Sequence, residues 1–249
     1  MIPVIAIDGP SASGKGTVAQ RVAEALGFTY LDSGAIYRVA ALAAERAGLA
    51  MVPVAGRDAA LGAGGAHDAW PALAAVAAAM PLRFAAGRVW LGDADVTDAI
   101  RSEQVGANAS RIAAIPAVRA ALLQRQRDLR VAPGLVADGR DMASVVFPDA
   151  ALKVFLTAAV EERAWRRVAQ LAEIALKDAK YLIEKEKDAK LSVLFDSVLS
   201  DLQERDRRDA GRVAAPLKQV EGAQLIDTTT LSIGEAVAQI LEWWASRAQ

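Results

Sequence analysis

The strongest chemical signal comes from nine consecutive residues near the N-terminus, with the sequence GPSASGKGT. They fit the pattern G-x-x-x-x-G-K, in which glycines let the backbone curl so that successive N–H groups face an anion. Lys15 supplies an ammonium for outer phosphates, and a helix starting near it adds the positive end of its dipole. The alternative is a glycine turn with a surface lysine, but chance gives this match, followed by Gly-Thr, only about 10⁻⁴ times per chain of this composition. The predicted phosphate-binding residues are Gly9, Pro10, Ser11, Ala12, Ser13, Gly14, Lys15, Gly16 and Thr17.

Two oxygen-bearing side chains are candidates for holding Mg²⁺ beside this loop. Gly16 follows Lys15, so the hydroxyl that binds Mg²⁺ or a phosphate oxygen comes one position later, from Thr17, as is typical of small-molecule and nucleotide kinases. Asp138 follows a short apolar run, and a carboxylate at the carboxyl end of a buried parallel strand is placed to hold Mg²⁺ through water. The alternative for Asp138 is a helix N-cap.

The composition excludes several other kinds of chemistry. The chain of 249 residues has no cysteine and one histidine, which excludes disulfides, cysteine nucleophiles and multi-histidine metal sites. Its 29 Lys and Arg against 30 Asp and Glu give a net charge of −1, which excludes a globally basic surface for duplex nucleic acid. Its 21 arginines suit phosphoryl transfer, which needs charge stabilisation and alignment more than covalent chemistry.

Short β-branched segments alternate with helical periodicity, an order that predicts βαβ units and a parallel sheet. The expected strands are residues 3–7, 28–31, 135–137, 152–156 and 224–226, and the expected helices are 17–26, 33–47 and 232–244. The predicted core comprises residues 1–50, 106–160 and 214–249.

Two stretches interrupt this plan. Residues 51–105 are rich in Gly, Pro and Ala and contain a predicted antiparallel hairpin around Ala86-Gly87. Residues 161–213 are charged and helical, and within them 177–190 holds five of the eight lysines of the chain. We interpret 177–190 as an added, solvated segment, with an exposed helix that carries no chemistry as the simplest alternative.

Helical spacing groups two further sets of side chains. Arg205, Asp209 and Arg212 stand at i, i+4 and i+7, so a helix places them on one face with the carboxylate between two guanidinium groups. The alternative is a solvated salt-bridge ladder. Ser33 and Tyr37 are four residues apart and therefore also share a face, where core packing is the alternative for Tyr37.

Four further segments, together with Gly9–Thr17, carry a resemblance that covers nearly the whole chain. These segments are LDSGAIYR at 31–38, DGRDM at 138–142, VFPD at 146–149 and ERDRRD at 204–209. The combination resembles the bacterial cytidylate kinases. The resemblance implies an α/β fold of the P-loop NTPase type, with a parallel sheet flanked by helices. It also implies a nucleoside-monophosphate-binding insertion with a small antiparallel sheet at 51–105 and a helical lid at 161–213, in which 177–190 is longer than usual.

The same resemblance implies transfer of the γ-phosphoryl group from ATP, with Mg²⁺, to CMP or dCMP. It assigns the CMP-binding residues as Ser33, Tyr37, Arg38, Arg101, Ser110, Arg119, Arg140, Asp141, Arg205, Asp209 and Arg212. In this assignment Arg101 and Arg119 hold the acceptor phosphate, Ser110 contacts the base, and Asp141 faces the sugar or base. The catalytic cations are Lys15, Arg140, Arg205 and Arg212.

Two other functions remain as alternatives. One is a P-loop kinase of another small acceptor, such as UMP, AMP or a non-nucleotide. The other is a nucleotide-binding switch without an acceptor, although the guanine motif N-K-x-D is absent from the sequence. With no signal-like or membrane-spanning segment visible, we expect a cytoplasmic monomer that binds ATP and CMP or dCMP and neither nucleic acid nor membrane.

Overall fold

The computed structural model describes residues 1–49, 65–85, 87–185, 188–212 and 214–247. Parts of the predicted core (residues 50 and 248–249), of the predicted insertion (51–64 and 86) and of the predicted lid (186–187 and 213) lie outside the described residues. The chain forms two compact units, residues 1–31 with 130–249 and residues 32–129, each of which is considered by itself. Among the described residues, no helix combines the length and apolar character needed to cross a membrane.

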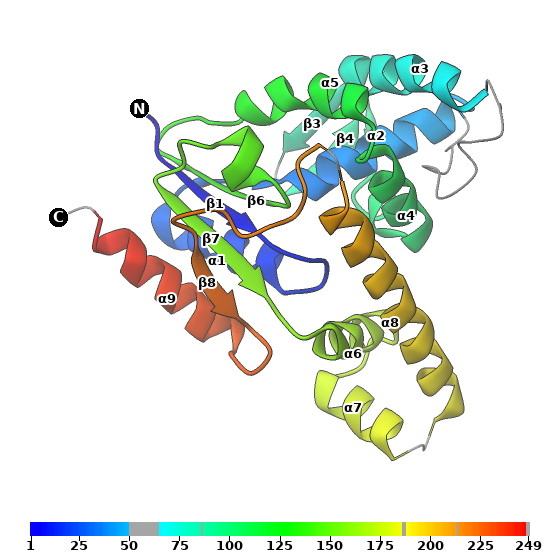
Figure 1. The fold of residues 1–249 in the computed structure, drawn as a ribbon, viewed down its shortest axis with the longest axis vertical. Coiled ribbons are helices and arrows are strands. Elements are labelled where there is room, and N and C mark those ends of the chain that lie inside the picture. The colour runs from blue at the N-terminus through cyan, green and yellow to red at the C-terminus, as the bar shows by residue number, and fades with distance from the viewer. Residues whose placement is uncertain (50–64, 86, 186–187, 213, 248–249) are drawn as a thin grey trace. The chain divides into compact units, whose positions relative to one another are not determined.

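The first unit is built on a five-stranded sheet in the order β2-β6-β1-β7-β8 (Figure 1). Its strands are β1 (Val4–Asp8), β2 (Thr29–Asp32), β6 (Leu135–Gly139), β7 (Leu152–Thr157) and β8 (Gln224–Asp227). The pairs of β1 with β6, β1 with β7 and β7 with β8 are parallel. All five expected strands are therefore present, and the predicted parallel sheet is confirmed.

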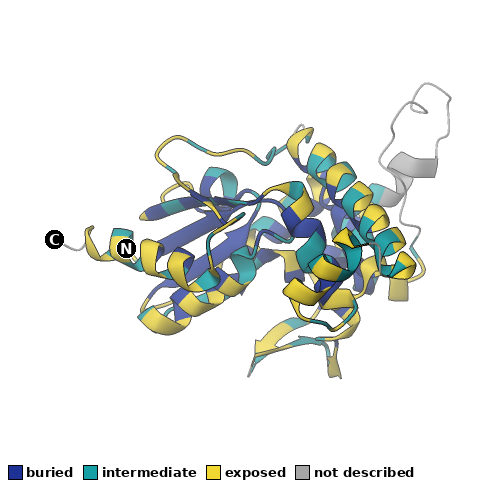
Figure 2. Ribbon diagram, turned by 90° about the horizontal axis from the view of Figure 1, so that it is seen from below, coloured by how far each residue is buried: buried dark blue, intermediate teal, exposed yellow. Residues whose placement is uncertain are grey.

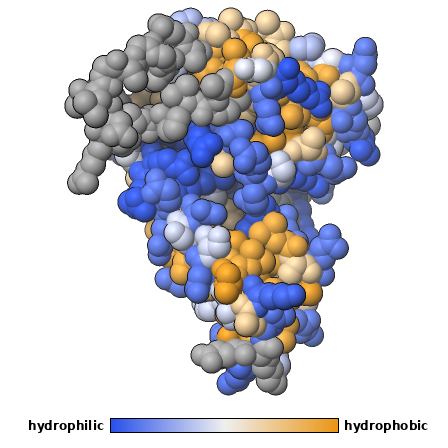
Figure 3. All heavy atoms as spheres, turned by 90° about the vertical axis from the view of Figure 1, so that its right-hand side faces the viewer, coloured by the Kyte–Doolittle hydropathy of each residue, from blue (hydrophilic) through white to orange (hydrophobic). Residues whose placement is uncertain are grey.

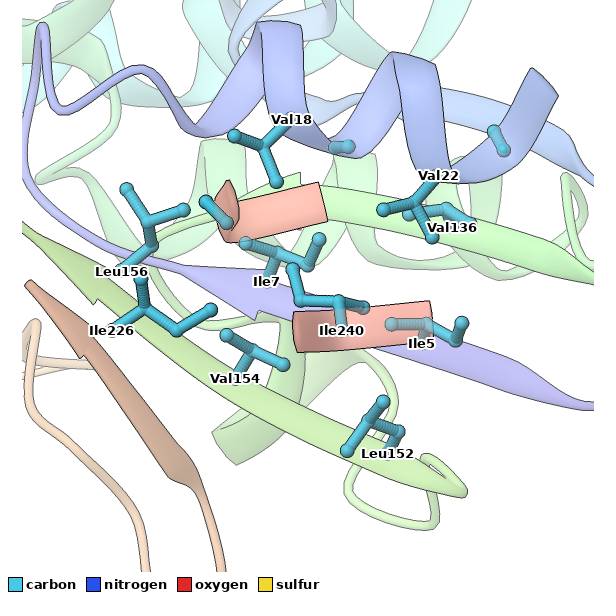
Figure 4. Packing of buried hydrophobic residues seen from close by; sticks show 13 residues of the cluster. Ile5, Ile7, Val18, Val22, Val136, Leu152, Val154, Leu156, Ile226 and Ile240 are labelled. Atoms are coloured by element: carbon cyan, nitrogen blue, oxygen red, sulfur yellow. The ribbon is translucent and has the colours of Figure 1, made fainter. Parts of the chain in front are cut away.

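Continuous apolar sequence explains why β1 lies at the centre of this sheet. All five of its residues are buried, as expected for a strand covered on both faces. On one face, Val18 and Val22 of α1 (Lys15–Leu26) and Ile240 of α9 (Ile233–Ala245) pack in one cluster with Ile5 and Ile7 of β1 (Figure 4). The central strands β1 and β6 are fully buried, and buried residues line the middle of the sheet in Figure 2. The packed sheet fixes where the polar residues at its strand ends lie.

The helix ends follow their sequence signals. Gly27 ends α1 with φ 65°, in the left-handed region that glycine adopts at low cost. Ser232 and Glu235 form a reciprocal capping box at the start of α9. The charged region predicted to be helical contains α6 (Val160–Leu171), α7 (Leu176–Glu184) and α8 (Ala189–Ala210). A π-helical turn, Met142–Val146, follows β6.

The second unit is mainly helical. Its elements are α2 (Ser33–Arg46), α3 (Gly65–Ala79), β3 (Leu82–Ala85), β4 (Arg88–Leu91), β5 (Ala94–Asp95), the 3-10 turn Ala99–Arg101, α4 (Glu103–Ile112) and α5 (Pro116–Arg127). The antiparallel pairing of β3 with β4 confirms the predicted hairpin, and β5 adds a third strand. These compact units divide the chain at other positions than the predicted functional segments, whose boundaries remain predictions.

Candidate functional site

The loop between β1 and α1 has the backbone shape of an anion cradle. Ala12 and Gly14 both lie in the left-handed region, with φ 58° and 88°, so the chain turns tightly around the loop interior. A non-glycine residue held in that region is strained, and such strain concentrates at functional sites. Gly14 is the N-cap of α1 and has no side chain with which to cap the helix. The positive end of the helix dipole therefore faces the loop that Gly9 begins.

Lys15 and Ser13 are both anchored to the same loop carbonyl. The Lys15 ammonium donates to Pro10 O at 3.2 Å, and the buried Ser13 hydroxyl donates to it at 3.0 Å. All nine predicted phosphate-binding residues lie in this loop or in the first turn of α1. A short loop with an inward-turned backbone and a lysine beside it has the geometry and charge needed to bind a polyphosphate.

Gly9 is required because the loop passes directly over β7. A Cβ built at Gly9 would lie 1.9 Å from Leu156 O and 3.0 Å from Leu156 C. Both atoms belong to the backbone of a buried strand, which cannot yield as a flexible side chain would. The first glycine of the motif therefore allows the backbone of the loop to lie directly against the backbone of β7.

We expect Gly9→Ala to lower the free energy of unfolding by about 3 kcal/mol, because the added methyl forces the loop away from β7. The matched control is Gly106→Ala inside α4, where a Cβ meets no atom within 4 Å in the part of the chain that the structure describes. That change should stabilise the protein by about 0.5–1 kcal/mol, since alanine favours a helix interior. Urea unfolding of both variants measures this difference, and equal midpoints would contradict the close approach.

Asp138 lies across from the first turn of α1. It is a buried residue of β6, and its Oδ1 accepts a hydrogen bond from the Tyr30 hydroxyl at 3.1 Å. A Cβ at Gly16 would lie 3.7 Å from Asp138 Oδ2, so the Asp138 carboxylate lies beside the first turn of α1. The N-cap position of the helical turn after β6 is Asp141 and not Asp138, so the N-cap alternative for Asp138 is wrong. Sequence reasoning did not identify Tyr30 as a partner of Asp138.

The oxygen ligands near the loop are of the kind that Mg²⁺ binds. Asp138 offers a carboxylate, and the exposed Thr17 on α1 offers a hydroxyl. Within the described ranges, no group of three or more His, Cys, Asp or Glu side chains is arranged to hold a metal by itself. This donor set therefore fits an ion that keeps waters and takes further oxygens from bound phosphates.

Asp8 is a site residue that the sequence analysis did not single out. Its carboxylate is buried, and its two oxygens accept from the backbone N–H groups of Met142 and Ala143, each at 2.8 Å. These bonds fix the turn that follows Arg140 and Asp141. Burial raises the pKa of Asp8 to about 6, against the opposing effect of the two N–H bonds. The available signal was a carboxylate at the end of a strand that is otherwise apolar.

This burial predicts a pH-dependent stability. Between the ordinary carboxyl pKa of 3.8 and about 6, folded Asp8 binds more protons than unfolded Asp8, so its contribution to stability falls as pH rises. We expect the melting temperature of the parent protein to decline relative to Asp8→Asn from about pH 4 to about pH 7. Thermal unfolding across that range tests this, with the exposed Asp98→Asn as control. A constant parent-to-Asp8→Asn difference would refute the prediction.

Arg140 connects the phosphate loop to the end of α8. Its guanidinium donates to Ser11 Oγ at 2.7 Å, to Gly139 O at 3.1 Å and to Asp209 Oδ2 at 2.8 Å. Arg212 donates to the other carboxylate oxygen, Asp209 Oδ1, at 2.5 Å. Asp209 is only 1% exposed, so two partly buried guanidinium groups share one buried carboxylate.

The charges around Asp209 keep it ionised. Burial alone would raise its pKa, but the positive charges of Arg140, Arg212 and Arg205 outweigh burial and hold the pKa below its usual value. The predicted carboxylate between guanidinium groups is thus present: Arg140 and Arg212 donate hydrogen bonds to it, and Arg205 adds a nearby positive charge. The alternative of a solvated ladder is wrong, because the carboxylate is excluded from water.

One detail of the helical prediction is wrong. Helix α8 ends at Ala210, so Arg212 does not share a helix face with Arg205 and Asp209. The chain leaves the helix at Gly211, and Arg212 reaches back to Asp209 from beyond it. A helical wheel cannot place a residue that follows the last helical turn.

Two arginines of α6 that the sequence analysis did not single out contact carbonyl oxygens of the phosphate loop. Arg163, itself buried, donates to Ser11 O at 3.2 Å and forms an ion pair with Asp206 of α8. Arg166 lies 3.5 Å from Ser13 O and also donates to Thr228. Their only sequence signal is a position in a helix that directly follows a buried strand. They clamp loop carbonyls and so help to fix the direction of the loop N–H groups.

The second unit holds the other predicted acceptor residues. Ser33 begins α2, and both Ser33 and Tyr37 are buried on it. The Arg119 guanidinium lies 5.9 Å from the centroid of the Tyr37 ring and donates to Ala113 O at 3.2 Å. This unit therefore brings Tyr37 and Arg119 together by a cation–π contact.

Three further predicted acceptor residues also lie in the second unit. Arg38 donates to Ile100 O at 3.4 Å, beside the exposed Arg101. Ser110 is buried within α4. Arg38 and Arg101 are thus near the same turn, and each position carries the residue type that an anionic acceptor requires.

The chain is similar to proteins of one family along almost its whole length. A sequence profile described as "Cytidylate kinase" matches residues 5–246. A relative named "Cytidylate kinase" from Chromobacterium violaceum is 51% identical over 246 residues, covering 99% of this chain and 97% of the relative. A relative of the same name from Bordetella pertussis is 50% identical over 244 residues, covering 98% and 96%. A solved structure, "Crystal structure of TT1252 from Thermus thermophilus", covers 99% of this chain and 98% of its own at 18% identity, with a TM-score of 0.42, too low to carry an argument.

Proposed function

The chain belongs to the cytidylate kinase family, and we propose that it transfers the γ-phosphoryl group of ATP to CMP or dCMP, producing ADP and CDP or dCDP. The observation that carries this proposal is the loop Gly9–Thr17, whose left-handed turns and lysine form a cradle for a polyphosphate at the start of α1. Phosphoryl transfer requires alignment and charge stabilisation from such groups, with little covalent chemistry by the protein.

In this mechanism the loop and Lys15 bind the β- and γ-phosphates of ATP. The left-handed turns at Ala12 and Gly14 hold the loop in one shape, so the loop needs little reorganisation when negative charge shifts during transfer. Thr17 and Asp138 would hold Mg²⁺, with Asp138 acting through water, and the ion would neutralise phosphate charge. Tyr30 orients the Asp138 carboxylate by its hydrogen bond at 3.1 Å.

The arginine cluster supplies the remaining positive charge. Arg140 contacts the loop through Ser11, and Asp209 holds it together with Arg212 in a fixed orientation. We assign Lys15, Arg140, Arg205 and Arg212 as the catalytic cations that stabilise charge on the transferred group. A buried carboxylate between guanidinium groups keeps these long side chains from adopting many rotamers, which lowers the entropic cost of alignment.

The acceptor nucleotide is assigned to the residues that the family resemblance implies, which are Ser33, Tyr37, Arg38, Arg101, Ser110, Arg119, Arg140, Asp141, Arg205, Asp209 and Arg212. Arg101 and Arg119 bind the acceptor phosphate, Ser110 the base, and Asp141 the sugar or base. The side-chain oxygens of Ser110 and Asp141 can accept a hydrogen bond from the 4-amino group of cytosine, which uracil replaces by a carbonyl. Segment 51–105 serves acceptor binding, and segment 161–213 closes as a lid that excludes water.

The proposal is tested by incubating the protein with Mg-ATP and each nucleoside monophosphate in turn, and measuring ADP production. We expect turnover with CMP or dCMP that depends on the acceptor. Strong turnover with UMP or AMP and none with CMP or dCMP would overturn the assignment in favour of another acceptor. ADP formation that does not depend on any acceptor would indicate a nucleotide switch.

A further inference from the structure

The described part of the added segment 177–190 belongs to the first unit and contacts other helices of that unit. Helix α7 contacts α6. Figure 3 shows hydrophobic residues gathered on the surface of the part of the molecule that Figure 1 labels α6, α7 and α8. Ala179 is fully buried, and Lys180 lies 4.8 Å from the centroid of the Trp165 ring. The interpretation of the segment as solvated is therefore wrong at Ala179, whereas Lys180 is partly exposed but has specific partners.

Lys180 shares a buried carboxylate with an arginine that touches the phosphate loop. The Glu162 side chain is only 7% exposed, and its two oxygens accept from different cations. Oε2 accepts from Lys180 Nζ at 2.6 Å, and Oε1 accepts from Arg166 Nε at 3.0 Å. Lys180 therefore helps to fix the orientation of the Glu162 carboxylate that Arg166 binds, and Arg166 does the same for Lys180.

The far side of Arg166 meets the loop. Its guanidinium donates to Thr228 Oγ1 at 3.1 Å and to Thr228 O, and lies 3.5 Å from Ser13 O. The buried Thr228 hydroxyl donates to the same Ser13 carbonyl at 2.9 Å. Ser13 immediately precedes the left-handed Gly14, so the orientation of its carbonyl bears on the N–H groups that open α1.

We propose that Lys180 is a positioning residue for the ATP phosphates, acting through Glu162 and Arg166 on the Ser13–Gly14 part of the loop. The inference rests on the proposed function, to which it adds a role for the added segment. Without Lys180, Glu162 Oε2 loses a charged donor in a buried setting, and the carboxylate is free to rotate away from Arg166. Arg166 then holds Ser13 O less firmly, and the phosphate cradle loses part of its preorganisation.

The test compares Lys180→Met, which keeps the length of the side chain and removes its charge, with Lys180→Arg, which restores the charge. Lys177→Met on the exposed face of the same helix is the matched control. We expect Lys180→Met to raise the KM for ATP about 10-fold, less than the ~10²-fold effect of a 1 Å misplacement at the reacting groups. The KM for CMP should change less than twofold, Lys180→Arg should recover most of the ATP effect, and Lys177→Met should match the parent protein.

Equilibrium dialysis with Mg-ATP separates this inference from the proposed function, because ATP binding can be measured with no acceptor present. If Lys180→Met binds ATP more weakly and Lys180→Arg and Lys177→Met do not, the positioning role is supported whichever acceptor the protein uses. An unchanged ATP affinity and KM, even with a lowered melting temperature, would show that Lys180 only stabilises the packing of α7 and would overturn the inference. Equal effects on the KM values of ATP and CMP would overturn it as well.

Discussion

Lys15→Ala is expected to lower kcat by ~10²-fold or more while leaving the melting temperature nearly unchanged. The ammonium supplies positive charge where the γ-phosphoryl group is transferred, and no neighbouring cation stands on the same loop between Gly9 and Thr17. Stability should be preserved because Pro10 O, which accepts from Lys15, also accepts from Ser13 Oγ at 3.0 Å. Removing the lysine therefore leaves this carbonyl with a hydrogen-bond donor.

Steady-state kinetics with CMP, together with thermal unfolding, measure both parts of this prediction. Lys218→Ala, at an exposed position of the first unit, is the control for the loss of a lysine charge. Near-normal kcat in Lys15→Ala would show that the cradle is wrongly assigned. A large loss of melting temperature would show instead that the lysine has a structural role.

Arg140→Ala is expected to lower kcat by ~10²–10³-fold and, unlike Lys15→Ala, to destabilise the protein. The change removes hydrogen bonds to Ser11 Oγ and Asp209 Oδ2. It leaves the Asp209 carboxylate, 1% exposed, with one guanidinium partner fewer. Breaking one pair of a buried ionic cluster costs about 3 kcal/mol.

A double variant separates the two effects of Arg140. Adding Asp209→Ala to Arg140→Ala removes the buried charge, so we expect stability to recover in part while turnover stays low. Arg207→Ala, whose side chain is 73% exposed on α8, controls for the loss of an arginine and should leave kcat unchanged. The assignment of Arg140 as a catalytic cation fails if the double variant regains turnover along with stability.

Sequence patterns predicted the sheet well because its signals are local. Each expected strand is a short β-branched or apolar run, and the structure contains a strand at every one of those places. Gly27 and Ser232 predicted helix ends through their own backbone and side-chain preferences. Prediction failed at Arg212, where the helix ended two residues earlier than the spacing required.

The positions of several site residues had no local signal. Asp8 binds N–H groups more than 130 positions along the chain, and Arg163 contacts Ser11 across a similar separation. Lys180 reaches Glu162 from a neighbouring helix, and its side chain looked like part of a solvated charge run in the sequence. None of these pairs has a spacing that a helix or strand period can reveal.

The amino-acid sequence alone determined the phosphate-loop motif, the five strands of the parallel sheet, the helices α1, α2 and α9, and the residues that mark the cytidylate kinases. These features depend on backbone preferences and on motifs a few residues long. Only the tertiary structure decided which charges meet: Arg140 with Asp209, Asp8 with the turn after β6, and Lys180 with Glu162. Those contacts depend on how the sheet and helices pack, because a buried charge must find its partner in space regardless of its distance along the chain.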